Sequence, residues 1–254
     1  MDLGLKGKTV IITGGTKGIG AGIARVFAEE GANLILDYRS DPEGSEAYVL
    51  QLRRECGTEV FGVQADVSRY EQVLRVFDTA QEKLGQLDVL INNAGGGTTT
   101  ALLDLSLEQW QDALDNNVTA MFMMSQEFAR RMISGNRKGY IVNVLSKASL
   151  TTTTKGRACY VTNKAAEMGL TKQLAVDLVD HGIIVNGIMP GTVWNRIMEQ
   201  LTPEQQAARL KRCPTGRFGT PYEFGKMVAF LASEQNQLSV GAPVDNTGGM
   251  MLGF

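Results

Sequence analysis

Tyr160 and Lys164 have the residue types and the spacing that proton transfer requires. They are four residues apart in a stretch with helical periodicity, so they share one face of the expected helix. A phenol has a pKa of about 10, and acting as a base near neutrality needs a shift of roughly 3 units, or about 4 kcal/mol, which a nearby ammonium could supply. By itself the pair is weak evidence, because tyrosine and lysine at this spacing also occur on ordinary surface helices.

Further polar side chains are expected close to this pair. Ser146 ends a predicted strand at the carboxyl edge, where doubly wound sheets bind ligands, and could donate a hydrogen bond to a substrate carbonyl. The segment Asn92-Asn93-Ala94-Gly95 ends another strand at the same edge, and Asn117 lies in the long helix that follows. Taken singly, these asparagines are more typical of residues that cap a turn or a helix.

A glycine-rich turn follows the first predicted strand and leads directly into a helix. It reads Thr13-Gly14-Gly15-Thr16-Lys17-Gly18-Ile19-Gly20. Glycine at positions 14, 18 and 20 lets the backbone approach a pyrophosphate, whose charge is then met by the helix N-terminus. The position between a strand and a helix favours dinucleotide binding over an ordinary tight turn.

The end of the second strand, Asp37-Tyr38-Arg39-Ser40, bears on the choice between NAD and NADP. An acidic side chain there would hold a ribose 2′-hydroxyl, and a basic one a 2′-phosphate. Side chains alternate faces along a strand, so Asp37 and Tyr38 cannot both point at the ribose. Lys17 and Arg39 together could bind a 2′-phosphate, whereas Asp37 alone could serve NAD.

Short apolar runs alternate with longer amphipathic stretches along the chain, which is the pattern of βαβ units. Seven of these runs indicate strands, over residues 9–15, 33–37, 59–67, 87–95, 140–146, 183–190 and 242–247. We therefore expect an α/β fold: a single domain over residues 1–254 with a Rossmann-like, doubly wound sheet of about seven parallel strands and helices on both faces.

Capping boxes mark several helix starts, because a serine or threonine is followed three residues later by Glu or Gln. They occur at Ser68, Ser106, Thr202 and Thr220, and the helices after Ser68 and Ser106 are expected to end near residues 85 and 133. A further helix is expected over about 157–180, which contains the tyrosine and lysine.

The regular pattern lapses for roughly 25 residues after Pro190, longer than an ordinary connection. We expect residues at about 192–216 to form a substrate lid. The sequence does not identify the substrate, because the substrate is selected by this lid, by the Gly96-Gly97 loop and by the threonines at 151–154. These threonines either line a polar pocket or form an exposed loop.

Composition narrows the class of protein. The 254 residues carry 25 Lys+Arg against 27 Asp+Glu, so the net charge of -2 offers no basic excess for nucleic acid or an anionic membrane. We see no export signal and no run of about 18 apolar residues. Cys56, Cys159 and Cys213 fit neither a disulfide framework nor a metal site, and they indicate reduced thiols in a cytoplasm.

Together these motifs resemble the classical short-chain dehydrogenase/reductase (SDR) family over essentially the whole chain. The turn at 13–20, Asn92-Asn93-Ala94-Gly95, Tyr160-x-x-x-Lys164 and Pro190-Gly191 occur in that family's order and approximate spacing. The resemblance implies a catalytic tetrad of Asn117, Ser146, Tyr160 and Lys164. Ser146 precedes Tyr160 by 14 residues, one more than we expect, so Ser149 is a weaker alternative for the serine.

The resemblance also implies a set of cofactor-binding residues. They are Gly14, Thr16, Lys17, Gly18, Ile19, Gly20, Tyr38, Arg39, Ser40, Asp66, Val67, Asn93, Ala94, Gly95, Tyr160, Lys164, Pro190, Gly191, Val193 and Asn195. Tyr38 takes the position of the family's NAD-selecting aspartate and Arg39 follows it, so the resemblance favours NADP(H) over NAD(H). Asn195 replaces the family's frequent threonine after Pro-Gly.

The expected function is an oxidoreductase that transfers a hydride between NADP(H) and a small-molecule ketone or secondary alcohol, with Tyr160 as general acid and base. The alternatives are an NAD(H)-dependent alcohol or polyol dehydrogenase, a 3-oxoacyl reductase, and a cofactor-binding sensor without catalysis. The 3-oxoacyl reductase is disfavoured because two arginines that dock the carrier protein in that group correspond to Tyr140 and Val176 here. The resemblance also suggests a homotetramer, or a homodimer, built through the helices at about 107–133 and 157–180.

Overall fold

Seven parallel strands form one sheet in this computed structural model, which describes residues 1–97, 99–152 and 154–252. The strands are β1 (Thr9–Ile12), β2 (Asn33–Tyr38), β3 (Val60–Gln64), β4 (Val89–Asn92), β5 (Gly139–Val144), β6 (Ile183–Pro190) and β7 (Pro243–Asn246). Their order across the sheet is β3-β2-β1-β4-β5-β6-β7. The order reverses between β1 and β4, which is where a doubly wound sheet opens a crevice. The predicted fold class is confirmed.

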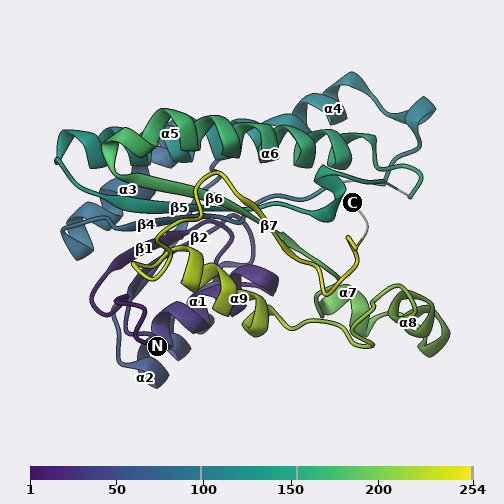
Figure 1. Cartoon of the computed structure of the whole chain (residues 1–254), viewed down its shortest axis with the longest axis horizontal. Coiled ribbons are helices and arrows are strands. Elements are labelled where there is room, and N and C mark those ends of the chain that lie inside the picture. The colour runs from purple at the N-terminus through teal and green to yellow at the C-terminus, as the bar shows by residue number, and fades with distance from the viewer. Residues whose placement is uncertain (98, 153, 253–254) are drawn as a thin grey trace.

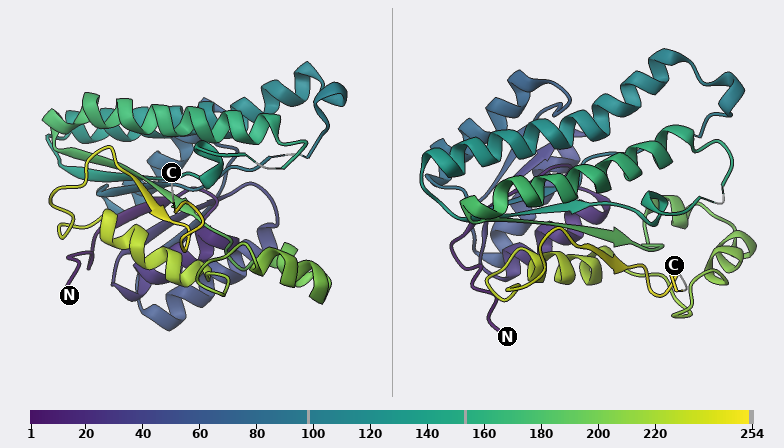
Figure 2. Two further views of the ribbon diagram at one scale, coloured as in Figure 1. Left: turned by 45° about the vertical axis from the view of Figure 1, so that its right-hand side comes forward. Right: turned by 45° about the horizontal axis from the view of Figure 1, so that its top comes forward.

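Helices cover both faces of this sheet (Figures 1 and 2). One layer holds α3 (Tyr70–Leu84), α4 (Leu107–Leu114), α5 (Ala120–Ser134) and α6 (Ala158–Leu178). The other holds α1 (Gly18–Glu29), α2 (Pro42–Cys56) and α9 (Pro221–Leu231). Parallel sheets are buried on both faces, and for that reason their strands are continuous apolar runs.

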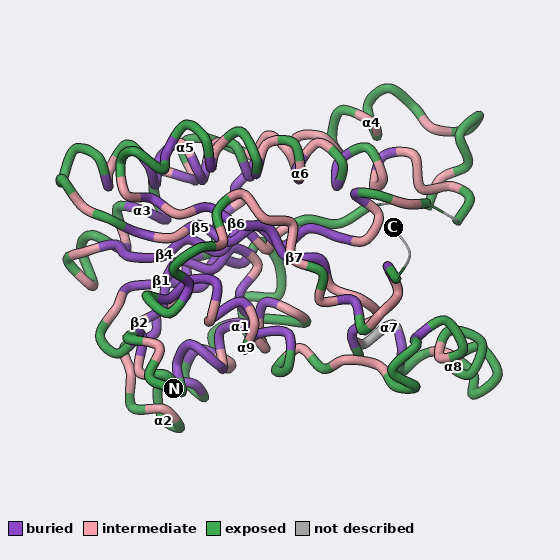
Figure 3. Tube along the Cα trace, in the orientation of Figure 1, coloured by how far each residue is buried: buried purple, intermediate pink, exposed green. Residues whose placement is uncertain are grey.

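The core is therefore divided by the sheet into two clusters. Figure 3 shows in purple the buried residues, many of which lie on the central strands. Successive side chains of a strand point to opposite faces, so Val10 and Ile12 pack with Phe27 of α1, while Ile11 packs with Phe77 of α3. Every residue of β1 is buried. This packing fixes where the carboxyl end of β1, and hence the glycine-rich turn, lies.

Three of the four predicted capping boxes are confirmed. The side chains of Ser106, Thr202 and Thr220 each accept a hydrogen bond from the backbone N–H three residues later, at the starts of α4, α8 (Pro203–Leu210) and α9. Each box is closed by the side chain of a Gln or Glu at that third position.

The fourth capping box, at Ser68, is wrong. Helix α3 begins at Tyr70 after Arg69, and no side chain caps it. The Ser68 hydroxyl instead donates a charge-assisted hydrogen bond to Asp66 Oδ1 at 2.7 Å and lies before the cap position, which Arg69 occupies. The predicted end of this helix is confirmed at Gly85, which adopts φ 72°.

The long helix expected after Ser106 contains a turn of π-helix, η2 (Asp115–Thr119), between α4 and α5. The carbonyl oxygen of Ala113 accepts hydrogen bonds from two side-chain amides, Asn117 Nδ2 at 2.7 Å and Asn163 Nδ2 at 2.8 Å. Single π turns inside helices often mark functional sites. Here the turn directs Asn117 toward the carboxyl edge of the sheet.

Residues 192–216 include the short helices α7 (Arg196–Glu199) and α8, which project beyond the sheet at the right of Figure 1. Val193 forms a parallel bridge with Gly219, so the segment leaves and returns at neighbouring points. Among the described residues, no helix is long and apolar enough to cross a membrane.

Candidate active site

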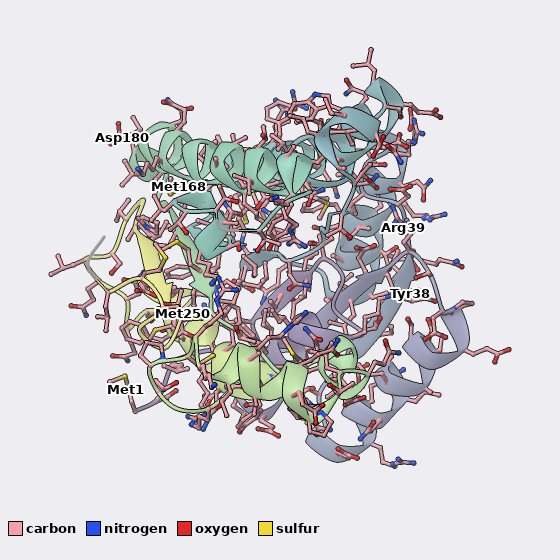
Figure 4. All side chains as sticks on the ribbon, turned by 90° about the vertical axis from the view of Figure 1, so that its right-hand side faces the viewer. Met1, Tyr38, Arg39, Met168, Asp180 and Met250 are labelled. Carbon is pink, nitrogen blue, oxygen red and sulfur yellow. The ribbon has the colours of Figure 1, made fainter. Side chains whose placement is uncertain are left out.

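A cleft of about 720 Å³ lies at the carboxyl edge of the sheet, where the strand order reverses between β1 and β4. Figure 4 looks onto the molecule from that side, with Tyr38 and Arg39 labelled toward the right of the view and Met250 left of its centre. The predicted site residues that line it are Gly14, Thr16, Lys17, Gly18, Ile19, Tyr38, Arg39, Ser40, Asp66, Val67, Asn93, Ala94, Gly95, Asn117, Tyr160, Lys164, Pro190 and Asn195. Gly20, Ser146, Gly191 and Val193 are not among its lining residues.

The glycine-rich turn needs glycine for two separate reasons. Gly14 and Gly18 adopt φ 60° and φ 56°, the left-handed region that side chains disfavour. Gly20 has an ordinary φ, but a Cβ there would overlap the carbonyl oxygen of Gly14 and lie 2.6 Å from Asn93 Nδ2. The turn therefore brings bare backbone to the N-terminus of α1, which is a favourable place for a phosphate.

The end of β4 clamps this turn. The Asn93 amide donates to the carbonyl oxygens of Thr13 and Gly14 at 2.9 and 3.1 Å. The backbone N–H groups of Asn93 and Ala94 both donate to Thr13 Oγ1 at 2.9 Å. Asn93 thus acts by holding the turn, as the capping interpretation of a single asparagine predicts.

Asp37 lies under the turn and is almost fully buried. Its Oδ2 accepts a hydrogen bond from the Gly14 N–H at 3.1 Å, while its buried Oδ1 has no partner among the described residues. Burial raises the pKa of Asp37 to about 7, and the hydrogen bond from Gly14 only partly opposes this. A carboxyl that ionises near neutrality therefore sits beside the expected phosphate position.

Tyr38 points the other way, as the alternation of a strand requires. Its hydroxyl donates to Glu46 on α2 at 2.7 Å. Arg39 reaches across the cleft to Asn116 Oδ1 at 2.6 Å, and Lys17 Nζ donates to Ser40 Oγ at 3.1 Å. Two cationic side chains therefore lie at the β2 end of the cleft. Each is hydrogen-bonded to a neutral side chain, which an anionic ligand could replace as the acceptor.

The end of β3 contributes Asp66 and Val67, with Val67 buried. Burial raises the pKa of Asp66, but hydrogen bonds from the Ser68 hydroxyl and N–H outweigh it, and the pKa is lowered overall. Asp66 is therefore an ionised acceptor at the side of the cleft, close to a small apolar wall.

Tyr160 and Lys164 both line the cleft from α6. Lys164 is buried, and its Nζ donates to the Val144 carbonyl oxygen at 3.0 Å. Gly97 packs against Tyr160, where an added Cβ would lie 2.9 Å from the tyrosine Cβ. The Arg157 guanidinium lies over the Tyr160 ring, with its carbon 4.2 Å from the ring centroid. Among the described residues, none is hydrogen-bonded to the Tyr160 hydroxyl.

Asn117 closes the same region from η2. Its Oδ1 accepts a hydrogen bond from the Gly96 N–H at 2.9 Å, and its side chain is buried. A Cβ on Gly95, which has φ 152°, would lie 2.6 Å from that same Oδ1. The π turn and the loop after β4 therefore fit together around one amide.

Ser146 follows β5 and caps the short helix η3 (Lys147–Ser149), which packs against α6. Its Oγ accepts a hydrogen bond from the Ala148 N–H at 3.1 Å. The alternative, Ser149, is also buried, and its Oγ has no partner among the described residues. Both serines are near the cleft, but neither belongs to its lining.

The segment after β6 completes the cleft. Pro190 ends the strand, and Gly191 passes so close to the backbone of Thr247 that a Cβ would overlap its carbonyl oxygen. Val193 is buried, and Asn195 Oδ1 accepts a hydrogen bond from the Met198 N–H at 3.1 Å at the start of α7. In the 151–154 loop, Thr153 lies outside the described residues.

Sequence reasoning missed two charged side chains in this region. Arg157 stacks on Tyr160, and Glu167, which is buried, holds Lys164 at 2.7 Å. The spacing of Glu167, three residues after Lys164, is a known signal for an ion pair on a helix. This spacing is enough to predict the ion pair between Lys164 and Glu167 from the sequence, whereas the burial of the pair follows only from the fold.

Comparison with known proteins agrees with this geometry. The family model described as short chain dehydrogenase matches residues 8–206. The chain is 36% identical over 250 residues to glucose 1-dehydrogenase 2 of Bacillus subtilis, which covers 98% of this chain and 96% of that protein. It is 34% identical over 245 residues to the 3-oxoacyl-(acyl-carrier-protein) reductase FabG of Staphylococcus aureus, which covers 96% and 98%. The structure of L-sorbose reductase from Gluconobacter frateurii, complexed with NADPH and L-sorbose, superposes with a TM-score of 0.93 over 100% of both chains at 28% identity.

Proposed function

Because the chain belongs to the short chain dehydrogenase family, and is thus an oxidoreductase of CH–OH and C=O groups that uses a nicotinamide cofactor, we propose that it interconverts a small-molecule ketone and a secondary alcohol with NADP(H) and Tyr160 as general acid and base. The observation that carries this proposal is the Tyr160–Lys164 pair at the edge of a cleft that begins at a phosphate-binding turn.

The residues of the cleft fit a dinucleotide. The turn at Gly14–Gly20 exposes backbone at a helix N-terminus. Asp66 and Val67 line the part of the cleft that we assign to adenine, and Lys164 lines the part that we assign to the nicotinamide ribose. We further assign Pro190, Gly191, Val193 and Asn195 to the carboxamide end. When bound, the nicotinamide cofactor accepts or supplies the hydride.

This chain's own residues then handle the proton. In reduction, the Tyr160 hydroxyl donates its proton to the carbonyl oxygen as the carbon receives hydride. Lys164 stabilises the phenolate that remains. The Ser146 hydroxyl accepts from Ala148 and so keeps its own O–H for the substrate oxygen. Asn117 shapes the loop at Gly95 and Gly96 that covers the reacting groups.

Replacing Tyr160 by Phe tests the assigned chemistry. The variant should bind NADPH as the wild type does, measured by cofactor fluorescence, but lose about a hundred- to ten-thousandfold in kcat with a reducible ketone. Tyr222→Phe, which removes a surface hydroxyl on α9, is the control and should stay active. Undiminished turnover by Tyr160→Phe would exclude Tyr160 as the acid.

We propose NADP(H) as the preferred cofactor because Lys17 and Arg39 stand at the β2 end of the cleft. Asp37, the acidic residue that could hold the ribose 2′-hydroxyl of NAD, instead accepts a hydrogen bond from the Gly14 N–H. Arg39→Asp should lower kcat/KM with NADPH by about ten- to a hundredfold, because a charge-assisted hydrogen bond contributes about 1.5–3 kcal/mol. Arg54→Asp makes the same charge change on α2 and should leave the preference intact. Equal selectivity of Arg39→Asp and wild type would refute the assignment.

Three alternative functions differ from this one in what they require. An NAD-linked alcohol or polyol dehydrogenase is separated from a ketoreductase by measured cofactor preference. A 3-oxoacyl reductase remains disfavoured, since Val176, at one carrier-docking position, is apolar and 69% exposed. A non-catalytic sensor would bind NADPH without oxidising it in the presence of any ketone.

We also propose that the protein is a cytoplasmic homotetramer or homodimer. Apolar side chains on the helices of the expected interface are exposed, including Leu107 on α4, Phe122 on α5 and Val176 on α6. The three cysteines are free thiols, which fits a reducing compartment. Residues 192–216 are proposed to close over the substrate as a lid within a single domain of residues 1–254.

A further inference from the structure

Glu167 is a buried carboxylate on α6 that the proposed chemistry does not use. Its side chain is 1% exposed, and its Oε2 lies 2.7 Å from Lys164 Nζ, the cation of the proton-transfer pair. Burial raises the pKa of Glu167, and the charge of Lys164 and its hydrogen bond oppose this only in part, so that the pKa is raised overall. A buried carboxylate is rarely retained without a partner or a role.

The contacts of Lys164 show how Glu167 restrains it. An ammonium group has three N–H donors. One is directed to the Val144 carbonyl oxygen at 3.0 Å and a second to Glu167. The third is left for the cleft, which Lys164 lines. Glu167 therefore fixes the direction in which the ammonium faces Tyr160 and the cofactor site.

Glu167 also offsets the charge of Lys164. Tyr160, Lys164 and Glu167 follow one another at intervals of four and three residues, so they lie along one face of α6. Seven residues of helix separate the Cα atoms of Glu167 and Tyr160 by about 10 Å along the axis. At that distance, with an effective dielectric constant of about 20, one charge shifts a titration by about one pH unit.

The other charges around this part of α6 do not replace Glu167. Arg157 stacks on the Tyr160 ring, and the packed elements bring Lys147 on η3, Asp112 on α4 and Asp115 on η2. On α5, Glu127 is engaged with Arg131, and η4 (Val179–His181) lies at the far end of α6. Strands β5 and β6 bring no charged side chain. Within the described residues, Lys164 is the only cation that pairs with Glu167.

We propose that Glu167 is a positioning residue that holds the Lys164 ammonium and offsets its charge, so that Tyr160 keeps its proton to higher pH than an unopposed lysine would allow. The proton that carbonyl reduction consumes is then available over a wider neutral range. This inference rests on the proposed function of Tyr160 and Lys164.

The test removes the charge of Glu167 and follows Tyr160 without cofactor. Tyr160 ionisation is measured in the apoprotein from near-ultraviolet phenolate absorbance, as the difference between each protein and its Tyr160→Phe counterpart. Glu167→Gln should lower the titration midpoint by about one pH unit. Glu127→Gln is the matched control, since Glu127 is also buried and paired with a cation at 2.7 Å, and it should leave the midpoint unchanged.

Two further variants keep the test decisive. Glu167→Met removes the same charge with a side chain of similar volume and replaces Glu167→Gln if the latter does not fold. Glu167→Asp retains the charge and should titrate within a few tenths of a unit of the wild type. A midpoint that is unchanged or raised in the neutral variant would overturn the inference.

Activity separates this inference from the proposed function. The pH at which kcat/KM for alcohol oxidation reaches half its maximum should fall with the titration midpoint in Glu167→Gln. If the wild type oxidises no alcohol and reduces no ketone while the midpoint still shifts, the proposed function fails and the electrostatic role of Glu167 stands. If the wild type is active and the midpoint does not shift, the role of Glu167 alone fails.

Discussion

Asp37→Asn should change how the stability of this protein depends on pH. Asparagine has nearly the shape of aspartate, and its Oδ1 can still accept the hydrogen bond from Gly14. It cannot ionise. The substitution therefore isolates the titration of one buried carboxyl beside the glycine-rich turn.

The magnitude follows from the pKa of Asp37, which burial raises to about 7 from an unfolded value of about 3.9. The native state holds its proton more tightly than the unfolded chain, so the stabilisation is complete below about pH 4 and is lost as pH rises through 7. Three units correspond to about 4 kcal/mol in total. Between about pH 5.5 and about pH 8 the expected loss is about 2 kcal/mol.

Urea unfolding at these two pH values, followed by tryptophan fluorescence, measures the effect. The wild type should lose about 2 kcal/mol more than Asp37→Asn between them, and the difference cancels the other titrating groups. The control is Asp66→Asn. The pKa of Asp66 is lowered, so its contribution is already complete above about pH 4 and should not change over this range.

Parallel pH dependences of wild type and Asp37→Asn would refute the reasoning. Such a result means that the Oδ1 atom, which has no partner among the described residues, is solvated well enough to keep an ordinary pKa. A constant offset between the two proteins would not matter, because the unpaired amide N–H of the asparagine adds a cost that is independent of pH.

Two other substitutions test the packing. Gly20→Ala should lower the free energy of unfolding by about 1–3 kcal/mol and weaken NADPH binding, because the methyl group displaces Gly14 from the turn. Gly169→Ala, at a helical position with open space, should raise the free energy of unfolding by about 1 kcal/mol. Equal thermal stability and cofactor affinity of the two variants would contradict this. Val176→Arg should dissociate the proposed oligomer in light scattering, while Leu50→Arg on α2, also well exposed, should not, and an unchanged mass for Val176→Arg would remove α6 from the interface.

Most of the fold could be predicted because its signals are local. Buried parallel strands are continuous apolar runs, and the predicted strand over 183–190 coincides with β6. Helix α2 was not predicted as a separate element, since only Ser45, Val49 and Leu52 are buried along its 15 residues and the apolar stripe is thin. Ser68 does not form the capping box that its spacing to Glu71 predicts, because its hydroxyl pairs with Asp66, which precedes the helix.

The site was predicted less completely than the fold, because proximity within a motif does not determine orientation. The spacing of Tyr160 and Lys164 sufficed to place both at the cleft. Ser146 stays a prediction as a donor to the substrate oxygen: its Oγ accepts a hydrogen bond from the Ala148 N–H, a contact that the sequence does not reveal, and the residue is not part of the cleft lining. The role of Asn93 as a clamp on the turn depends on contacts 79 and 80 residues away in sequence.

The π turn imposes a length constraint on the segment from α4 to α5. Each residue of an α-helix rotates the next by about 100°. Phe128 and Met132 of α5 are anchored in the core, so deleting one residue from 115–119 would either rotate them out of the sheet's cover or swing α4 away from the cleft. We expect this stretch to tolerate many exchanges of side chain but no change in the number of residues. The number of residues sets the rotation between α5, which packs in the core, and α4, which lines the cleft.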